Sequence, residues 1–330
     1  MIRSTTVRTG VAALALTTAL AGCGANKSDN EQLAGCEQTY TIGFSHPVGE
    51  AQFVKALKDY VAQYGPNERC TEVLLDNTTG NNLEAQRATV EGWVTQQVDA
   101  IVLWPVDPSA FTNLMSRAQQ QGTKWLTYVA PMDGQDGRVG FDAAQEGEQI
   151  AGDVADWLQK RYPAGGVAAA VTTLTTLPVV EGRWEPPMRK LAELGIPVVS
   201  EQDCADQSCG LQIAEDALRE NPQLRVFIGL NDDVALGAQK AVQNSGLDVE
   251  EFYISGHDGS PEGLEAIKAK TGAFRATTAI PIADLGRSII DNSIAAITGE
   301  GTADALTPTV LIHPDDTQQI DQLLATMRGS

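Results

Sequence analysis

The feature that most constrains the fold is a regular alternation of strand-like and helix-like segments. Residues 39–45 are rich in β-forming side chains, and residues 52–64 carry apolar side chains at helical spacing. Further strands are expected at 71–76, 100–104, 124–129, 138–141, 166–172, 196–200, 225–229, 251–255 and 274–279. Further helices are expected at 83–97, 108–121, 145–161, 179–194, 210–220, 233–244, 261–270 and 282–298. This alternation predicts an α/β fold with parallel sheets covered on both faces, and about ten such units are too many for one sheet. We therefore expect two lobes.

The carboxyl ends of the expected strands are the natural place for a ligand. In open α/β sheets ligands bind beyond those ends, and two facing lobes would put the ends on opposite walls of one cleft. The residues at these positions are Ser45-His46, Asp76-Asn77, Trp104-Pro105, Phe141-Asp142, Asn231-Asp232 and Asp258. The sequence therefore predicts a cleft with polar and aromatic walls. His46 itself is expected to be a solvated loop histidine.

The charge balance excludes one class of partner. The 330 residues include 23 Lys and Arg against 43 Asp and Glu, a formal net charge of −20, and contain no basic run. Nucleic-acid binding relies on clustered positive charge over phosphates, so no nucleic-acid partner is expected. With 42% hydrophobic and 20% charged residues, the composition is that of a globular protein.

The first residues are typical of a targeting segment. Arg3 and Arg8 precede an uncharged run at 10–21, which leads into Leu-Ala-Gly-Cys at 20–23. A short positive region followed by an apolar run is the signature of a secretory signal peptide, and Leu-Ala-Gly-Cys resembles the lipobox of bacterial lipoproteins. We therefore expect a signal peptide at 1–22, lipidation of Cys23 and a tether at 23–37, which would anchor the protein to the extracytoplasmic face of the cell membrane. The alternative is ordinary small-residue cleavage with a chance cysteine.

The cysteines predict two disulfides. Of the five cysteines, lipidation of Cys23 would leave four, an even number in an oxidising compartment. We expect Cys36 to pair with Cys70, because each directly precedes an expected strand and adjacent parallel strands start side by side. We expect Cys204 to pair with Cys209 in the same loop; four free thiols are the alternative. The three histidines are scattered and no Cys-x-x-Cys occurs, so no metal site and no cofactor are expected.

Three stretches carry a resemblance to a known family. They are residues 98–102 (VDAIV) before a Pro-x-Asp, residues 231–238 (NDDVALGA) and residues 256–263 (GHDGSPEG). In their order and spacing they resemble the sugar-binding proteins of ABC importers, in the ribose-binding-protein-like cluster of type I periplasmic binding proteins.

This resemblance implies both a fold and a function. The fold would be two Rossmann-like lobes joined by a three-crossing hinge, with lobe one at 38–142 plus 281–306 and lobe two at 143–280 plus 307–330. The protein would be an extracytoplasmic component that captures a sugar or polyol between the lobes and delivers it to an ABC transporter permease. We expect it to act as a monomer.

The polar candidates for binding lie in lobe two. Carboxylates, amides and guanidinium groups bind vicinal hydroxyls with paired hydrogen bonds. Asp258 matches the family's hydroxyl-binding aspartate, although it could instead cap the helix that follows. Asn231 matches the family's ligand asparagine, and the neighbouring Asp232 is expected to cap the next helix. Arg183 aligns with the family's arginine, and a surface salt bridge is its alternative role.

The aromatic candidates to cover the apolar face of a sugar are Phe53, Trp104, Tyr128 and Trp184. Phe53 also fits the core stripe of its helix, and Trp104 could be a buried sheet residue, so both roles stay open. Asp142 ends a strand at the first expected crossing. It either binds the ligand or caps the following helix.

The sequence departs from the ribose-binding pattern at two places. The acidic–basic pair after the fourth strand is replaced by Val129-Ala130, and the glutamine near the third crossing is replaced by Ile280. Two polar anchors are lost, and the pocket becomes more apolar. This favours a small neutral polyol or a less common monosaccharide over ribose.

Two other functions are alternatives. An enzyme is not expected, because the chain has no Gly-x-Ser-x-Gly, His-Glu-x-x-His, Gly-x-Gly-x-x-Gly or phosphate loop. A carbohydrate-active hydrolase with paired carboxylates stays an alternative, since an acidic chain contains many candidate pairs. A binding protein that presents its sugar to a membrane receptor would use the same fold.

Overall fold

The computed structural model describes residue 33 and residues 35–327. The expected signal peptide, Cys23 and most of the tether lie outside the described residues. Within the described part, no helix has the length and apolar character needed to span a membrane.

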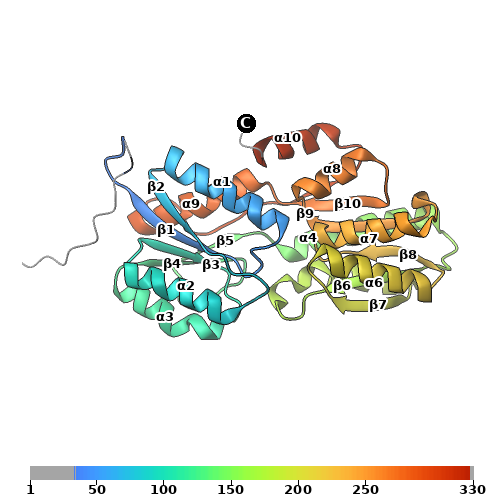
Figure 1. Cartoon of the computed structure of the whole chain (residues 1–330), viewed down its shortest axis with the longest axis horizontal. Coiled ribbons are helices and arrows are strands. Elements are labelled where there is room, and N and C mark those ends of the chain that lie inside the picture. The colour runs from blue at the N-terminus through green and yellow to red at the C-terminus, as the bar shows by residue number, and fades with distance from the viewer. Residues whose placement is uncertain (1–32, 34, 328–330) are drawn as a thin grey trace, which may run out of the picture. The chain divides into compact units, whose positions relative to one another are not determined.

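Six strands form the first sheet, in the order β11-β5-β4-β3-β1-β2, and all neighbouring strands are parallel. The strands are β1 (Tyr40–Ser45), β2 (Thr71–Leu75), β3 (Ala100–Leu103), β4 (Lys124–Tyr128), β5 (Gly137–Gly140) and β11 (Ala305–Leu306). Its helices are α1 (Gln52–Glu68), α2 (Leu83–Gln96), α3 (Pro108–Gln120) and α9 (Ile282–Thr298). Helix α1 packs beside α9, and α2 packs beside α3 on the other face (Figure 1). We call this sheet with these helices lobe one.

Six further strands form the second sheet, in the order β12-β10-β9-β8-β6-β7. They are β6 (Ala168–Thr173), β7 (Val198–Asp203), β8 (Leu224–Ile228), β9 (Tyr253–Asp258), β10 (Phe274–Ala279) and β12 (Val310–Ile312). Only β12 runs antiparallel to its neighbour among these described strands. Its helices are α4 (Ala143–Arg161), the 3₁₀ helix η1 (Pro178–Arg183), α5 (Glu185–Glu193), α6 (Gln207–Glu220), α7 (Asp232–Ser245), the 3₁₀ helix η2 (Val249–Glu251) and α8 (Pro261–Ala269). We call this sheet with these helices lobe two.

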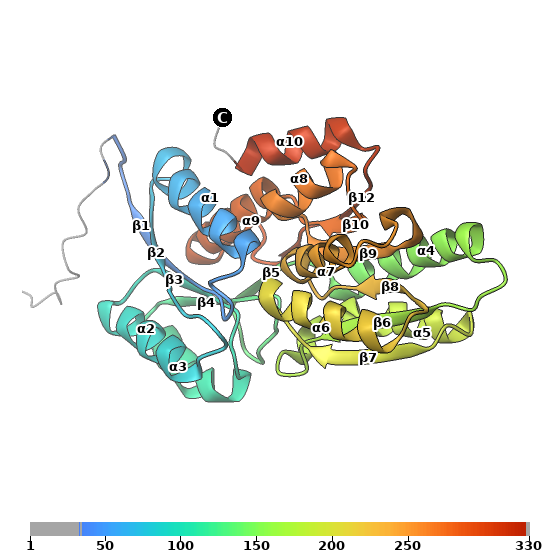
Figure 2. The ribbon, with the colours of Figure 1, turned by 45° about the vertical axis from the view of Figure 1, so that its right-hand side comes forward.

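The chain passes between the two sheets three times. It leaves the first sheet after β5, returns to it after β10 and leaves it again after β11. The last helix, α10 (Thr317–Met327), then packs against α8 and α9 (Figure 2). The expected α/β fold with two parallel-sheet lobes and three crossings is confirmed. The exact residue boundaries of the lobes stay a prediction.

Helix boundaries differ from expectation where prolines lie. The helix expected at 179–194 is divided at Trp184 into η1 and α5, and the reason is Pro186-Pro187, which lack N–H donors and disfavour helical backbone before them. Helix α1 behaves in the opposite way. A turn was expected at Gly65-Pro66, but the helix continues to Glu68, where the Arg69 N–H bonds to the Gly65 carbonyl.

Both disulfides form as expected. Cys36 and Cys70 are joined with their Cα atoms 5.8 Å apart. Cys70 directly precedes β2 and Cys36 lies shortly before β1, and the paired register of the two strands begins with Tyr40 opposite Thr71. The second bridge joins Cys204 to Cys209 at 5.9 Å, between the end of β7 and the first turn of α6.

Candidate functional site

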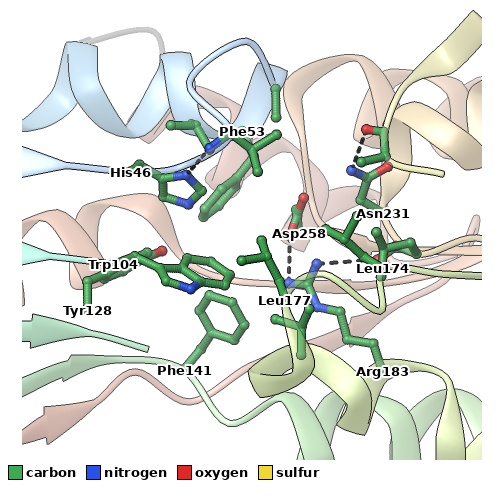
Figure 3. Close-up of a pocket in the computed structure, with 16 residues that line it drawn as sticks. His46, Phe53, Trp104, Tyr128, Phe141, Leu174, Leu177, Arg183, Asn231 and Asp258 are labelled. Carbon is green, nitrogen blue, oxygen red and sulfur yellow. Dashed lines mark hydrogen bonds and ion pairs between the residues drawn. The ribbon is translucent and has the colours of Figure 1, made fainter. Parts of the chain in front are cut away.

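One pocket is lined by residues of both lobes. Most of its walls stand at the carboxyl ends of strands, as the alternation predicts. Lobe one contributes His46, Phe53, Trp104, Tyr128 and Phe141, and lobe two contributes Leu174, Leu177, Arg183, Asn231 and Asp258 (Figure 3).

The polar side of the pocket is built on Arg183. Its Nη2 donates to Asp258 Oδ1 at 2.7 Å, and its Nη1 donates to the Leu230 carbonyl at 3.3 Å. Its Nε donates to Glu146 Oε2 at 2.9 Å, so one guanidinium lies between two carboxylates. The same group stands over the Phe141 ring, 5.0 Å from its centroid. Arg183 is therefore a buried member of an ion-pair network, and the alternative of a surface salt bridge is wrong.

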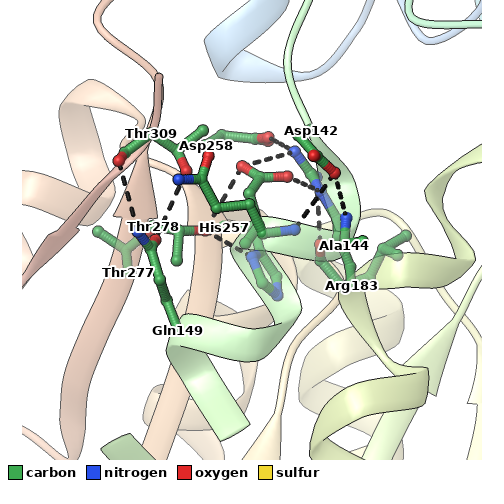
Figure 4. Close-up of polar contacts among 12 residues, drawn as sticks. Asp142, Ala144, Gln149, Arg183, His257, Asp258, Thr277, Thr278 and Thr309 are labelled. Carbon is green, nitrogen blue, oxygen red and sulfur yellow. Dashed lines mark hydrogen bonds and ion pairs between the residues drawn. The ribbon is translucent and has the colours of Figure 1, made fainter. Parts of the chain in front are cut away.

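Glu146 was not singled out from the sequence. It lies in the first turn of α4 and is fully buried. Burial raises the pKa of its carboxyl to about 7, while Arg183 acts in the opposite direction. Thr278 donates to its Oε1 at 3.4 Å and is in turn bonded to His257 Nδ1 at 2.6 Å (Figure 4). The only local signal was an acidic residue at a helix N-terminus, which is more often a solvent-exposed charge.

Asp258 ends β9 with its backbone at φ 99°, a conformation that L residues rarely adopt. It does not cap the next helix: Ser260 takes that role and accepts from the Gly263 N–H. Burial raises the pKa of Asp258 and the neighbouring Arg183 lowers it. The carboxylate therefore faces the pocket with one oxygen bonded to Arg183.

The helix cap expected at Asp232 is provided by Asn231 instead. Asn231 is the residue that caps α7, where its Oδ1 accepts from the Val234 N–H, while its Nδ2 donates to the Ala205 carbonyl. The expectation that Asp232 caps the helix is wrong. Its side chain is buried and accepts from Thr277 Oγ1 and from the Ser260 N–H, because Asp232 already belongs to the first turn of α7. Asn231 still lines the pocket.

The lobe-one wall is aromatic. Trp104 and Tyr128 are both buried, with ring centroids 5.8 Å apart, and Phe53 lines the pocket while its helix packs in the core. Trp184 is buried in the core at the start of α5 and does not line the pocket. Asp142 caps α4 by accepting from the Ala144 and Gln145 N–H groups, and it also lies outside this pocket.

His46 differs most from its expectation as a solvated loop residue. It is only 4% exposed, and its ring packs 4.9 Å from that of Trp104 and 5.5 Å from that of Tyr128. It therefore belongs to the aromatic wall of the pocket. Burial, with the nearby Lys58 and Arg183, holds the pKa of His46 well below its usual value.

Among residues 33 and 35–327, no group of three or more His, Cys, Asp or Glu side chains is arranged to hold a metal ion. The pocket instead combines charged hydrogen-bonding groups on one wall with ring faces on the other. Such a site is suited to a small molecule that carries hydroxyl groups on an apolar skeleton.

Comparison with known proteins agrees with this geometry. The chain is 27% identical to the ribose import binding protein of Bacillus subtilis over 240 residues, which cover 71% of this chain and 75% of that protein. An ABC transporter solute-binding protein from Bacillus halodurans, solved with bound myo-inositol, has the same fold (TM-score 0.75, 23% identity, 88% of this chain and 99% of that one). A protein from Actinobacillus succinogenes solved with D-allose is also similar (TM-score 0.76, 19% identity, 85% and 99%). The periplasmic binding protein domain model matches residues 42–301. The chain therefore belongs to the periplasmic binding protein family, in its type I, ribose-binding-like form.

Proposed function

We propose that this protein is the extracytoplasmic solute-binding component of an ABC importer and that it captures a neutral sugar or polyol. Its family consists of substrate-binding proteins rather than enzymes. The observation that carries the proposal is the pocket itself, in which Asp258 and Arg183 face the Trp104 ring across the two lobes. The names of the relatives, which bind ribose, myo-inositol or D-allose, support the same ligand class.

The charges favour a neutral ligand. The guanidinium of Arg183 is already paired with the carboxylates of Glu146 and Asp258, so the pocket offers an anion no unpaired Arg183 charge. A hydroxyl group can donate to the Asp258 carboxylate and accept from a free Arg183 N–H. The C–H surface of the same molecule can lie against Trp104 and Phe53.

The apolar replacements support a ligand other than ribose. Val129, Ala130 and Ile280 are buried, and none of them lines the pocket. The two polar anchors of the ribose-binding pattern therefore have no counterpart at these positions. We propose a small polyol or a less common monosaccharide.

We also propose that residues 1–22 are removed as a signal peptide and that lipidated Cys23 anchors the mature chain outside the cell membrane. Expression in a bacterial host with metabolic labelling by a fatty acid tests this. The wild-type chain should carry label and sediment with membranes, whereas Cys23→Ser should lose both properties. Label on the Cys23→Ser variant would contradict the proposal.

The ligand class is tested by a thermal-shift screen of the chain from residue 24 onward against monosaccharides, polyols and inositols. A ligand at 100 times its Kd should add about 2.7 kcal/mol to the stability of the folded state and raise its Tm. At the same ligand concentration the added stability should fall below about 1 kcal/mol in Asp258→Ala. It should persist in Asp321→Ala, which changes an exposed side chain of α10. Failure of every neutral compound to raise the Tm of the folded protein, or turnover of a sugar in a product assay, would overturn the proposal.

A further inference from the structure

The aromatic wall of the pocket contains one polar side chain that the proposed function does not use. His46 directly follows β1, lines the pocket and lies beside Phe53 and Trp104 (Figure 3). Its Nδ1 accepts a hydrogen bond from the Val48 N–H at 3.1 Å. Because a nitrogen that accepts carries a lone pair, the neutral ring must carry its proton on Nε2.

The surroundings keep this ring neutral. Lys58 of α1 and Arg183 of η1 are the cations near it, and both lower the pKa of His46 in addition to the effect of burial. Lys58 is itself held by the Asp76 carbonyl, and Arg183 by its two carboxylates, so neither moves away freely. Tyr128 adds an uncharged ring, since burial raises its pKa well above the usual value. His46 is therefore a fixed hydrogen-bond donor rather than a pH switch.

That donor is unused in the structure. Across the described residues, His46 makes only the Nδ1 bond, and its Nε2 has no protein partner. Two neighbours in the same wall share this property: Trp104 Nε1 and Tyr128 Oη are buried and have no partner within the described part of the chain. Unlike those two atoms, His46 Nε2 is not fully buried, and because His46 lines the pocket, a ligand can reach this donor.

We propose that His46 is a specificity-determining residue that donates its Nε2–H to an oxygen of the bound ligand. The proposal deepens the function proposed above and rests on it. Lobe two holds the ligand through Asp258 and Arg183, whereas His46 adds a directed contact from lobe one. Since Nε2–H can only donate, the ligand oxygen that faces it must accept. This selects for the orientation of one hydroxyl or ring oxygen, which ring stacking alone does not do.

Two matched substitutions separate the donor from the rest of the side chain. Asparagine places an oxygen close to Nδ1 and can still accept from Val48, but it has nothing at the position of Nε2. Glutamine reaches further and can present an amide N–H near that position. With the ligand found in the screen, His46→Asn should weaken binding about 10- to 100-fold, and His46→Gln should recover most of the affinity.

Singly deoxygenated analogues of that ligand provide the decisive measurement. For the oxygen that His46 contacts, removal should weaken binding to the wild type and leave binding to His46→Asn unchanged, whereas every other removal should weaken both proteins equally. The proposal would be overturned if every analogue lost the same affinity for the wild type as for His46→Asn, or if His46→Asn bound the full ligand as tightly as the wild type does. Either result would leave sugar binding itself intact. Failure of the wild type to bind any neutral compound would instead overturn the proposed function, and this inference with it.

The wild-type protein gives a second measurement that needs no variant. A long-range ¹H–¹⁵N spectrum at neutral pH should show His46 as the neutral Nε2–H tautomer, because burial lowers its pKa well below the usual value. Saturation with ligand should shift the Nε2 resonance more than that of Nδ1. An Nδ1–H tautomer, or an Nε2 resonance that ligand does not move, would refute the assignment.

Discussion

Replacement of Glu146 by glutamine should flatten the pH dependence of stability in the mildly acidic range. Glu146 is fully buried and shares Arg183 with Asp258, so two carboxylates compete for one cation. Burial raises its pKa to about 7, from a usual value of 4.5. Glutamine has nearly the same shape as the protonated side chain but cannot ionise. The substitution therefore removes the ionisation of this side chain and changes little else.

The sign follows from the direction of the shift. Because the folded-state pKa is higher than the unfolded one, the folded protein binds the proton more tightly, and this stabilisation is present in full below about pH 4.5. It is lost as the pH rises towards 7 and stays constant above that value. At about 1.4 kcal/mol per pKa unit, the loss over this interval is about 3 kcal/mol. The unfolding free energy of the wild type, relative to Glu146→Gln, should fall by that amount between pH 4.5 and 7.5.

Urea unfolding followed by tryptophan fluorescence and circular dichroism at several pH values measures this difference. Glu148→Gln is the matched control, because Glu148 lies on the same helix but its side chain is 59% exposed and pairs with Arg189 at the surface. Its unfolding free energy should follow that of the wild type within about 0.5 kcal/mol at every pH. Parallel pH profiles for the wild type and Glu146→Gln would refute the reasoning, since they would mean that Glu146 has the same pKa in the folded and unfolded chains.

Other perturbations have equally definite outcomes. In titration calorimetry, Asp258→Ala should cost about 2–4 kcal/mol of binding and Trp104→Ala only about 1–2 kcal/mol, because the first change strands charged partners and the second removes stacking; the reverse order would contradict the division between the walls. Removing the Cys36–Cys70 bridge, which spans 34 residues, should lower the unfolding free energy by about 3–4 kcal/mol in urea titrations, and an unchanged midpoint would refute this. Small-angle scattering should give a smaller radius of gyration with saturating ligand, since only a closed state lets both lobes contact it, and an unchanged profile would argue against closure.

The main strands and helices could be predicted because their signals are local. Strands β8 and β9, for example, are apolar runs followed directly by a polar cap and a helix, and the structure gives them close to the expected bounds. Strands β11 and β12 were not predicted. They have two and three residues, and they exist only because the crossing segments run alongside the edges of the two sheets.

The structure brings together six of the eight candidate binding residues predicted from the sequence. Five of them stand at strand ends or carry the family resemblance, and Phe53 lies on α1. Asp142 and Trp184 lie outside the pocket for a local reason. Asp142 begins a helix whose N–H groups it can satisfy itself, and Trp184 stands where two prolines divide a helix and turn the chain into the core. A position next to a strand end, or next to a binding residue in the sequence, is therefore not enough to predict that a residue lines the pocket.

The roles of Glu146 and His46 were beyond the sequence because burial is not a local property. The two carboxylates bonded to Arg183 come from positions 37 residues before it and 75 residues after it, so only the assembled fold shows that they meet there.

The chemical type of the partners of Arg183 could still have been deduced from the sequence. A cleft with an aromatic wall and a buried arginine needs carboxylates within reach, because an unpaired buried charge costs several kcal/mol. Asp258 is expected in that cleft from the sequence, but the Nε of Arg183 bonds to Glu146 instead and needs this separate acceptor. The geometry of a guanidinium thus predicts a second acidic residue behind the pocket, and the fold supplies it from α4.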